Sequence, residues 1–358
     1  MKNLVVFLLF VNLNTFAQIS SSKTENVFVV TIDGIRWQEI FKGADEDIIN
    51  DSRFTSNPGL SRLMYYDSSA TESRKKLLPF FWNVIQNKGR LYGNKQYDNK
   101  LRVANSYKFS YPGYNEMLTG YPDIHVNSNE KIDNVNINVL EFLNSFDEFK
   151  NRVVAFTSWN IFPYILNKSR SGFPLYSGYD SIDHDGNINI EMFNKLQEYI
   201  NSEKTDTRED KLTFIAAFQY IKAHKPKVAF ISLGESDEDA HAGQYDKYLQ
   251  HLNEADNMIQ ALWYFIQSVP EYKDKTTILI TTDHGRGRRS KKWTDHDIMV
   301  KGSGDAWLAI IGPDTVPGGE IQLPQKHYQK QIAATIANLL GYHFIANHPV
   351  AKPIDFTN

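Results

Sequence analysis

Continuous apolar runs recur along the chain and alternate with segments of helical spacing. The runs occupy residues 27–32, 153–156, 227–233, 276–282 and 306–311. Unbroken runs of this length are typical of parallel strands that are covered on both faces. The segments between them include the helical patterns 211–224, 245–269 and 329–340. This alternation predicts an α/β fold, namely a doubly wound, mainly parallel sheet with helices on both faces.

The first eighteen residues have a different pattern. Lys2 precedes the apolar run 4–11, and Thr15-Phe16-Ala17 ends in a small residue before Gln18. This is the pattern of a bacterial secretory signal peptide, and its apolar run is too short to span a bilayer. We therefore expect a periplasmic or secreted protein without a transmembrane anchor after signal removal. The mature chain, 19–358, reads as one catalytic domain with loop-rich insertions at about 45–75 and 170–190.

Polar side chains gather where the apolar runs end. Asp33 follows the first run, Asp283-His284 follows the run 276–282, and His296 lies twelve residues further on. Asp237 and His241 are four residues apart, which puts both on one face of a helical turn, so that one metal ion can take both. Taken alone, Asp33 is better explained as a helix cap. The acidic stretch around Asp237 would be explained as an exposed loop if it did not follow a predicted buried strand.

Ser110 precedes a Pro-Gly pair and a short apolar helical segment, in the sequence FSYPGYNEMLTGYPD. A hydroxyl at this position caps a helix N-terminus, and the same position favours a bound anion. For an isolated serine, capping is the simpler interpretation.

Composition narrows the chemistry. The 358 residues include no Cys, so any metal must be held by His, carboxylate or hydroxyl groups. The formal net charge of −3 does not indicate an overall basic surface for nucleic acid, and we expect no stable nucleic-acid partner. Five Lys and Arg residues crowd the loop 286–292; they form either a solvated surface or a field that attracts an anionic substrate.

The ordered set of motifs resembles the alkaline phosphatase superfamily, most closely its nucleotide pyrophosphatase/phosphodiesterase branch and related secreted bacterial phosphatases. The resemblance rests on Asp33 in TIDG, a hydroxyl before Pro at Ser110, Asp237-x-x-x-His241, Asp283-His284-Gly285 and the late His296. It covers roughly residues 26–345. Each piece is weak, but their order is specific.

The resemblance implies two divalent metal ions, usually Zn²⁺, and a small phosphorylated substrate. One ion would be held by Asp237, His241 and His296, and the other by Asp33, Asp283, His284 and Ser110. Ser110 would also be the nucleophile and would carry a phosphoserine intermediate. The expected function is that of a metal-dependent phosphoric ester hydrolase, either a phosphomonoesterase or a phosphodiesterase.

Substrate contacts are less clearly marked than the metal ligands. The asparagine that contacts a phosphoryl oxygen in the phosphodiesterase branch has only candidate counterparts here, Asn127 and Asn129. Arg36 and Arg286 are candidate cations for a monoester dianion. Relatives usually carry Thr followed by Phe-Pro-Asn, where this chain has Ser110-Tyr111-Pro112-Gly113. The departure leaves substrate choice open.

Two alternatives differ in chemistry. A sulfatase-like hydrolase shares the fold, but its formylglycine motif places an Arg where this chain has Tyr114, and it typically uses calcium rather than His-ligated zinc. A secreted binding protein would keep the metals as structural supports without turnover. Replacing Ser110 with Ala would distinguish the binding protein from a hydrolase, because a binding protein would keep its ligand affinity and metal content and would have no activity to lose.

Overall fold

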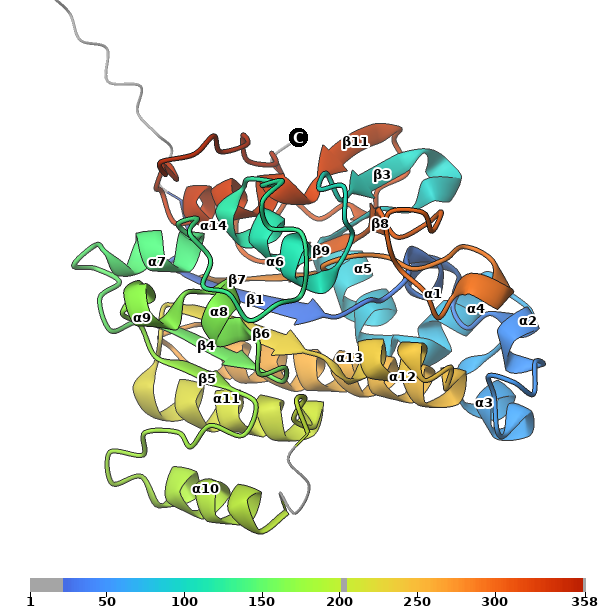
Figure 1. Cartoon of the computed structure of the whole chain (residues 1–358), viewed down its shortest axis with the longest axis horizontal. Coiled ribbons are helices and arrows are strands. Elements are labelled where there is room, and N and C mark those ends of the chain that lie inside the picture. The colour runs from blue at the N-terminus through green and yellow to red at the C-terminus, as the bar shows by residue number, and fades with distance from the viewer. Residues whose placement is uncertain (1–21, 201–204, 357–358) are drawn as a thin grey trace, which may run out of the picture.

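Strand β1 (Asn26–Ile32) lies near the middle of an eight-stranded sheet in the computed structural model, which describes residues 22–200 and 205–356 (Figure 1). In spatial order the strands are β10 (Gly319–Glu320), β2 (Arg90–Tyr92), β9 (Leu308–Ile311), β7 (Thr276–Thr281), β1, β6 (Val228–Leu233), β4 (Val153–Thr157) and β5 (Leu175–Ser177). Only β9 runs antiparallel to its neighbours. The predicted fold class, a mainly parallel α/β sheet, is confirmed.

Successive side chains of β1 pack alternately into two separate hydrophobic cores. Phe28, Val30 and Ile32 belong to one buried cluster, and Val27 and Val29 to the other. Because successive side chains of a strand point to opposite faces, a strand that is apolar at every position requires cover on both sides. The unbroken run 27–32 is therefore the local cause of the layered architecture.

Helices cover both faces of the sheet (Figure 1). The face of the first cluster is covered by α10 (Ile188–Ile200), α11 (Asp210–His224), α12 (Glu235–His241) and α13 (Tyr245–Ser268), and beside them by α1 (Trp37–Lys42), α2 (Glu46–Ile49), α3 (Pro58–Tyr65) and α4 (Ala70–Leu77). The opposite face carries α6 (Ser110–Thr119), α7 (Val139–Asn144), α8 (Phe162–Ile165), α9 (Lys168–Ser171) and α14 (Ile332–Leu339).

Short elements complete the fold. A second, three-stranded sheet has the order β11 (Gln325–Tyr328), β3 (Asn99–Arg102) and β8 (Asp305–Ala306). The π-helical turn η1 (Phe81–Ile85) leads into α5 (Gln86–Lys88), and the 3₁₀ turns are η2 (Lys95–Tyr97), η3 (Ser290–Lys292) and η4 (Gln329–Gln331).

Three local predictions are wrong. The segment 45–75 is not loop-rich, because α2, α3 and most of α4 occupy it. The sequence of residues 102–106 also predicts a strand, but β3 ends at Arg102. The spacing of residues 77–87 predicts one helix, but the segment is divided among α4, η1 and α5, since Leu78 precedes Pro79 and a residue before proline is disfavoured in the helical conformation. The buried Asp256 carboxylate then accepts the N–H groups of Phe80 and Phe81.

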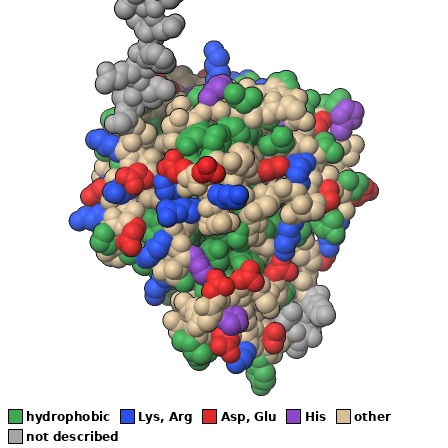
Figure 2. Space-filling view, turned by 90° about the vertical axis from the view of Figure 1, so that its left-hand side faces the viewer, with side chains coloured by type: hydrophobic (Ala, Val, Ile, Leu, Met, Phe, Trp, Pro, Cys, Tyr) green, Lys and Arg blue, Asp and Glu red, His purple; other side chains and the backbone are tan. Residues whose placement is uncertain are grey.

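The surface is mixed in character. Acidic and basic side chains are interspersed over the face shown in Figure 2, as on an ordinary solvated surface. None of the helices formed by the described residues combines the length and the apolar character needed to cross a bilayer. The expected signal peptide, residues 1–18, lies outside the described residues.

Candidate metal centre

The carboxyl ends of three neighbouring parallel strands bring the predicted ligands together. Ile32 of β1 pairs with Leu233 of β6, and Thr31 pairs with Thr281 of β7, so the residues that follow these strands meet at one edge of the sheet. His284 Nε2 lies 3.5 Å from Asp33 Oδ1 and 3.3 Å from Asp283 Oδ2. These three buried residues form the first candidate ligand group.

A second ligand group adjoins the first. His241 Nε2 lies 3.2 Å from Asp237 Oδ2 and 3.0 Å from His296 Nε2. The rings of His296 and His284 stack with their centroids 3.8 Å apart. Asp237 Oδ1 is 3.8 Å from His284 Nε2 and 3.9 Å from His296 Nε2. The two groups therefore meet at Asp237, and all six predicted Asp and His ligands lie together.

Hydrogen bonds show which ring nitrogen of His284 and of His296 is available to bind a metal ion. His284 Nδ1 lies 3.1 Å from the carbonyl of Gly285, and His296 Nδ1 lies 2.8 Å from the carbonyl of Lys108. A carbonyl only accepts, so Nδ1–H donates in both rings and each Nε2 keeps a free lone pair. His296 Nε2 directly faces His241 Nε2, and this approach requires a proton or a cation between them.

The electrostatics of the site favour a bound cation. Burial, together with the charges of Asp283 and Asp237, raises the pKa of Asp33 well above its usual range. Burial and Asp237 raise the pKa of Asp283 to about 7. Asp33 Oδ1 and Asp283 Oδ2 have no hydrogen-bond partner among the described residues. A cation would offset this repulsion and satisfy both oxygens.

The imidazoles are held in the form that binds metals. Burial lowers the pKa of His296 to about 4 and, with the charge of His296, holds that of His284 well below its usual range. Neutral imidazole is the ligand form, and a mixed set of His and Asp suits zinc and similar divalent ions. The residues present therefore fit divalent metal ions.

Ser110 lies against the first ligand group. It is the first residue of α6, is buried, and its Oγ lies 3.2 Å from His284 Nε2. Gly113 permits this approach, because a Cβ there would lie 2.6 Å from the carbonyl oxygen of Asp283. Tyr114, on the next turn of α6, donates its hydroxyl to Asp33 Oδ2 at 3.1 Å. One short helix thus presents the hydroxyl and orients a candidate ligand.

The two arginines predicted to bind substrate are paired with carboxylates. The Arg36 guanidinium is buried against Glu39 and lies 3.4 Å from Asp45. Arg286 is also buried; it donates to the carbonyls of Gly34 and Thr294 and forms an ion pair with Asp237. Although burial raises the pKa of Asp237, Arg286 and His241 bring it well below its usual range. Arg286 thus orients a candidate ligand, and neither arginine lines the cavity described next.

A cavity of about 220 Å³ opens over Ser110 and both ligand groups. Its lining comprises Asp33, Ser110, Asn129, Trp159, Asp206, Thr207, Gly234, Asp237, Glu238, His241 and His296. Asn129 is thus placed at the cavity, where its Oδ1 accepts the N–H of Tyr111. Asn127 lines a different cavity, beside Asp123 and His125.

Sequence reasoning missed several residues of this site. Tyr114 is one of them: its spacing of four from Ser110 puts both on one helix face, but the sequence does not show that its hydroxyl reaches Asp33. The others are Asp206, Thr207 and Glu238, which line the cavity. Asp206 and Thr207 lie on a loop that is distant from the motifs in the sequence, and no local sequence pattern indicates that they reach the site.

Comparisons with known proteins agree with this geometry. A sequence model of the Metalloenzyme superfamily matches residues 182–343. Alkaline phosphatase PafA is structurally similar, with a TM-score of 0.61, 11% identity and coverage of 93% of this chain and 98% of PafA. The phosphonate monoester hydrolase of Agrobacterium radiobacter has a TM-score of 0.54, 12% identity and coverage of 92% and 76%.

The lipoteichoic acid synthase LtaP from Listeria monocytogenes has a TM-score of 0.56, 13% identity and coverage of 89% of this chain and 72% of LtaP. No curated protein sequence matches the chain significantly. At such low identities the structural likenesses establish the fold.

The chain has an alkaline phosphatase-like α/β fold, and the Asp and His residues that meet at its sheet edge form candidate metal sites. The sequence match over residues 182–343 is to the Metalloenzyme superfamily, and the structural neighbours share the fold. The matched segment contains Asp237, His241, Asp283, His284 and His296, whereas Asp33 and Ser110 precede it.

Proposed function

We propose that the chain hydrolyses phosphoric esters through a phosphoserine intermediate on Ser110, with two divalent metal ions, zinc in the simplest case. The observation that carries the proposal is the position of Ser110 Oγ, 3.2 Å from His284 Nε2. That nitrogen lies 3.5 Å from Asp33 Oδ1 and 3.3 Å from Asp283 Oδ2, two carboxylate oxygens without a hydrogen-bond partner among the described residues. A buried hydroxyl at this point has the surroundings that a serine nucleophile needs.

Each of the two ligand groups would hold one metal ion. Asp33, Asp283 and His284 would hold one ion beside Ser110, and Asp237, His241 and His296 would hold the other. When bound, the ions would favour the deprotonated serine and offset the negative charge of the reacting phosphoryl group. Tyr114 and Arg286 fix the orientations of Asp33 and Asp237.

The cavity supports a small phosphate ester as the substrate. Its volume of about 220 Å³ accommodates a phosphoryl group and the first atoms of one substituent. Asn129 is the nearest candidate amide for a phosphoryl oxygen, because it shares the cavity with Ser110. Monoester and diester hydrolysis are both compatible with this lining. We further propose that the mature protein acts in the periplasm or outside the cell, as its N-terminal sequence predicts.

The test is hydrolysis of a phosphate monoester and a matching diester by the zinc-loaded mature protein. Ser110→Ala and a chelated sample should abolish turnover, whereas Ser106→Ala, an exposed serine on the preceding loop, should retain it. The ratio of the two rates assigns the preferred ester. Zinc-loaded protein that hydrolyses neither ester would overturn the proposal, and turnover of a sulfate ester instead would favour the sulfatase-like alternative.

A further inference from the structure

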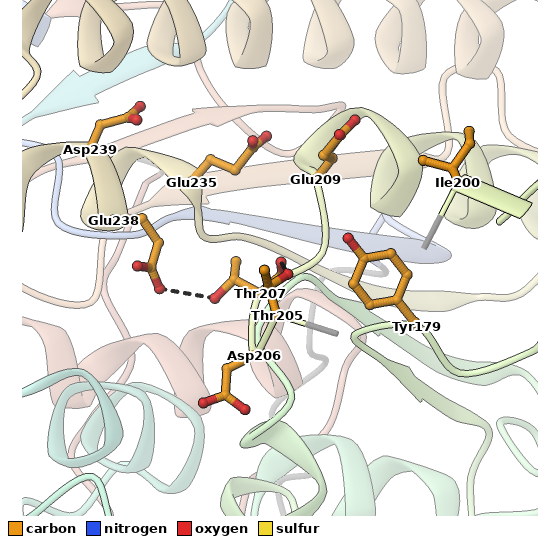
Figure 3. Close-up of a pocket in the computed structure, with 9 residues that line it drawn as sticks. All are labelled: Tyr179, Ile200, Thr205, Asp206, Thr207, Glu209, Glu235, Glu238 and Asp239. Carbon is orange, nitrogen blue, oxygen red and sulfur yellow. Dashed lines mark hydrogen bonds between the residues drawn. The ribbon is translucent and has the colours of Figure 1, made fainter. Parts of the chain in front are cut away.

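The cavity over Ser110 continues into a larger one. The second cavity has a volume of about 580 Å³, and it shares Asp206, Thr207 and Glu238 with the first. Figure 3 shows these three residues together, with Thr207 donating its hydroxyl to Glu238 at 3.0 Å. We refer to the two cavities together as the substrate cleft.

The larger end of the substrate cleft is strongly acidic. Five carboxylates line it, and none of its described lining residues is a Lys or Arg: Asp206, Glu209, Glu235, Glu238 and Asp239. His251 offsets part of this charge from behind, since its ring nitrogens lie 2.5 Å from Asp239 and 3.6 Å from Glu235.

The other three carboxylates are exposed to the cleft and less well compensated. Asp206 accepts from Asn160 at 2.7 Å and lies 3.4 Å from the exposed Lys131 amine. Among the described residues, Glu238 accepts only the neutral Thr207 hydroxyl, and Glu209 is exposed. The described residues that line the larger end of the cleft therefore carry a net negative charge at neutral pH.

An acidic surface alone would not indicate a ligand, but this one shares a cleft with the candidate reaction centre. At the other end of the cleft, Asp33 is only 4% exposed, and no described residue forms a hydrogen bond with its Oδ1. That buried oxygen points to a ligand independently of the acidic cluster. A substrate that reacts at Ser110 must place its remaining atoms in the same cleft.

The arrangement also indicates which part of the substrate meets the carboxylates. Ser110 approaches from the His284 side, whereas Glu238 follows Asp237 in α12, on the side of His241. In an in-line displacement the leaving alcohol departs opposite the attacking oxygen. An alcohol that departs on that side would face Glu238 and Asp206, which line the same cavity as Ser110.

We propose that the substrate cleft selects phosphate esters whose alcohol carries a protonated amine. This inference rests on the proposed function and specifies its substrate class. Carboxylates and the Thr207 hydroxyl are acceptors suited to an ammonium group, and Trp159 and Tyr179 add aromatic surfaces to the two ends of the cleft. The negative charge of these carboxylates also repels substrates whose leaving alcohol carries further negative charge, such as a phosphorylated nucleoside.

The test compares isosteric substrates that differ in one charge. The probes are 2-aminoethyl and 6-aminohexyl phosphate, each paired with the alkyl phosphate that has CH₃ in place of NH₃⁺. The measured quantity is the kcat/KM ratio of charged to neutral ester, in wild type, Glu238→Gln, Asp206→Asn and the double variant. Comparing variants with wild type cancels the intrinsic difference between the leaving groups. Glu271→Gln is the matched control, because it removes an exposed carboxylate before β7, at the opposite edge of the sheet.

We expect the ratio to fall about two- to five-fold in each single variant and about ten-fold in the double variant, and to decrease with added salt. An unchanged ratio in the double variant, with both esters still hydrolysed, would overturn the cleft assignment and leave the hydrolase proposal standing.

If neither monoester is hydrolysed, the comparison of monoester and diester described above decides the proposed function, and the cleft is tested by binding. Ligand-observed NMR then compares 6-aminohexanol with heptanol on the zinc-loaded protein. Preferential binding of the amine that is lost in the double variant supports the acidic site, and equal binding in both proteins overturns it.

Discussion

Gly113→Ala provides a sharp test of how closely α6 must approach the metal centre. The new Cβ would lie 2.6 Å from the Asp283 carbonyl oxygen, about 0.8 Å closer than an ordinary contact of 3.4 Å. This neighbour is backbone, so α6 itself must shift. Overpacking of this kind costs about 1–3 kcal/mol, and the higher helix propensity of Ala offsets about 1 kcal/mol of it. The expected loss of stability is therefore modest.

The expected effect on turnover is larger. A displacement approaching 1 Å between Ser110 and the ligand group at His284 would lower kcat/KM by about 100-fold. Gly59→Ala is the control, because its Cβ would meet nothing closer than 3.7 Å in α3 and should stabilise the protein by up to about 1 kcal/mol. The assays are urea unfolding, zinc content and kcat/KM. A Gly113→Ala protein with wild-type kcat/KM would refute the reasoning.

Three further perturbations test residues around the site. Tyr114→Phe removes the donor to Asp33 and should weaken zinc binding by about 10- to 100-fold in a chelator competition; unchanged affinity would contradict its orienting role. Arg286→Gln leaves the Asp237 carboxylate without its guanidinium partner and should destabilise the metal-free protein by about 3–5 kcal/mol in urea unfolding. A loss of stability below about 1 kcal/mol would contradict the role of this ion pair. Burial lowers the pKa of His251, but the carboxylates of Asp239 and Glu235 outweigh this effect and raise the pKa to about 9. Its contribution to stability is complete below about pH 6.5 and is lost as the pH rises through 9, so His251→Gln should cost about 1–2 kcal/mol at pH 6 and little at pH 10. A cost independent of pH would show that the charge is not responsible.

The sequence predicted the centre of the sheet better than its edges. Strands β1, β6 and β7 are buried on both faces, so their sequences consist almost entirely of apolar and β-branched residues. The edge strands β5 and β10, and β2 beside β10, have at most three residues each, too few to show any periodicity. Their positions are set by tertiary contacts that no local pattern records.

The candidate ligands were predictable for a related reason. A parallel sheet brings the carboxyl ends of its strands to one edge, so residues that follow apolar runs meet whatever their separation in sequence. The arginines were not predictable in this way, because a guanidinium is directed by its partners. For Arg36 a local signal existed in Glu39, three residues later in the same helical turn, whereas the pairing of Arg286 with Asp237 depends on the assembled fold.

The central claim is that Ser110 is the nucleophile of a metal-dependent phosphoric ester hydrolase. Its most direct test is acid quenching of the zinc-loaded protein during turnover of a phosphate ester, followed by peptide mass spectrometry. The account predicts one added phosphoryl group on the peptide that contains Ser110, absent in Ser110→Ala and in chelated protein. Sustained turnover without this modification, or with the phosphoryl group on another residue, would contradict it.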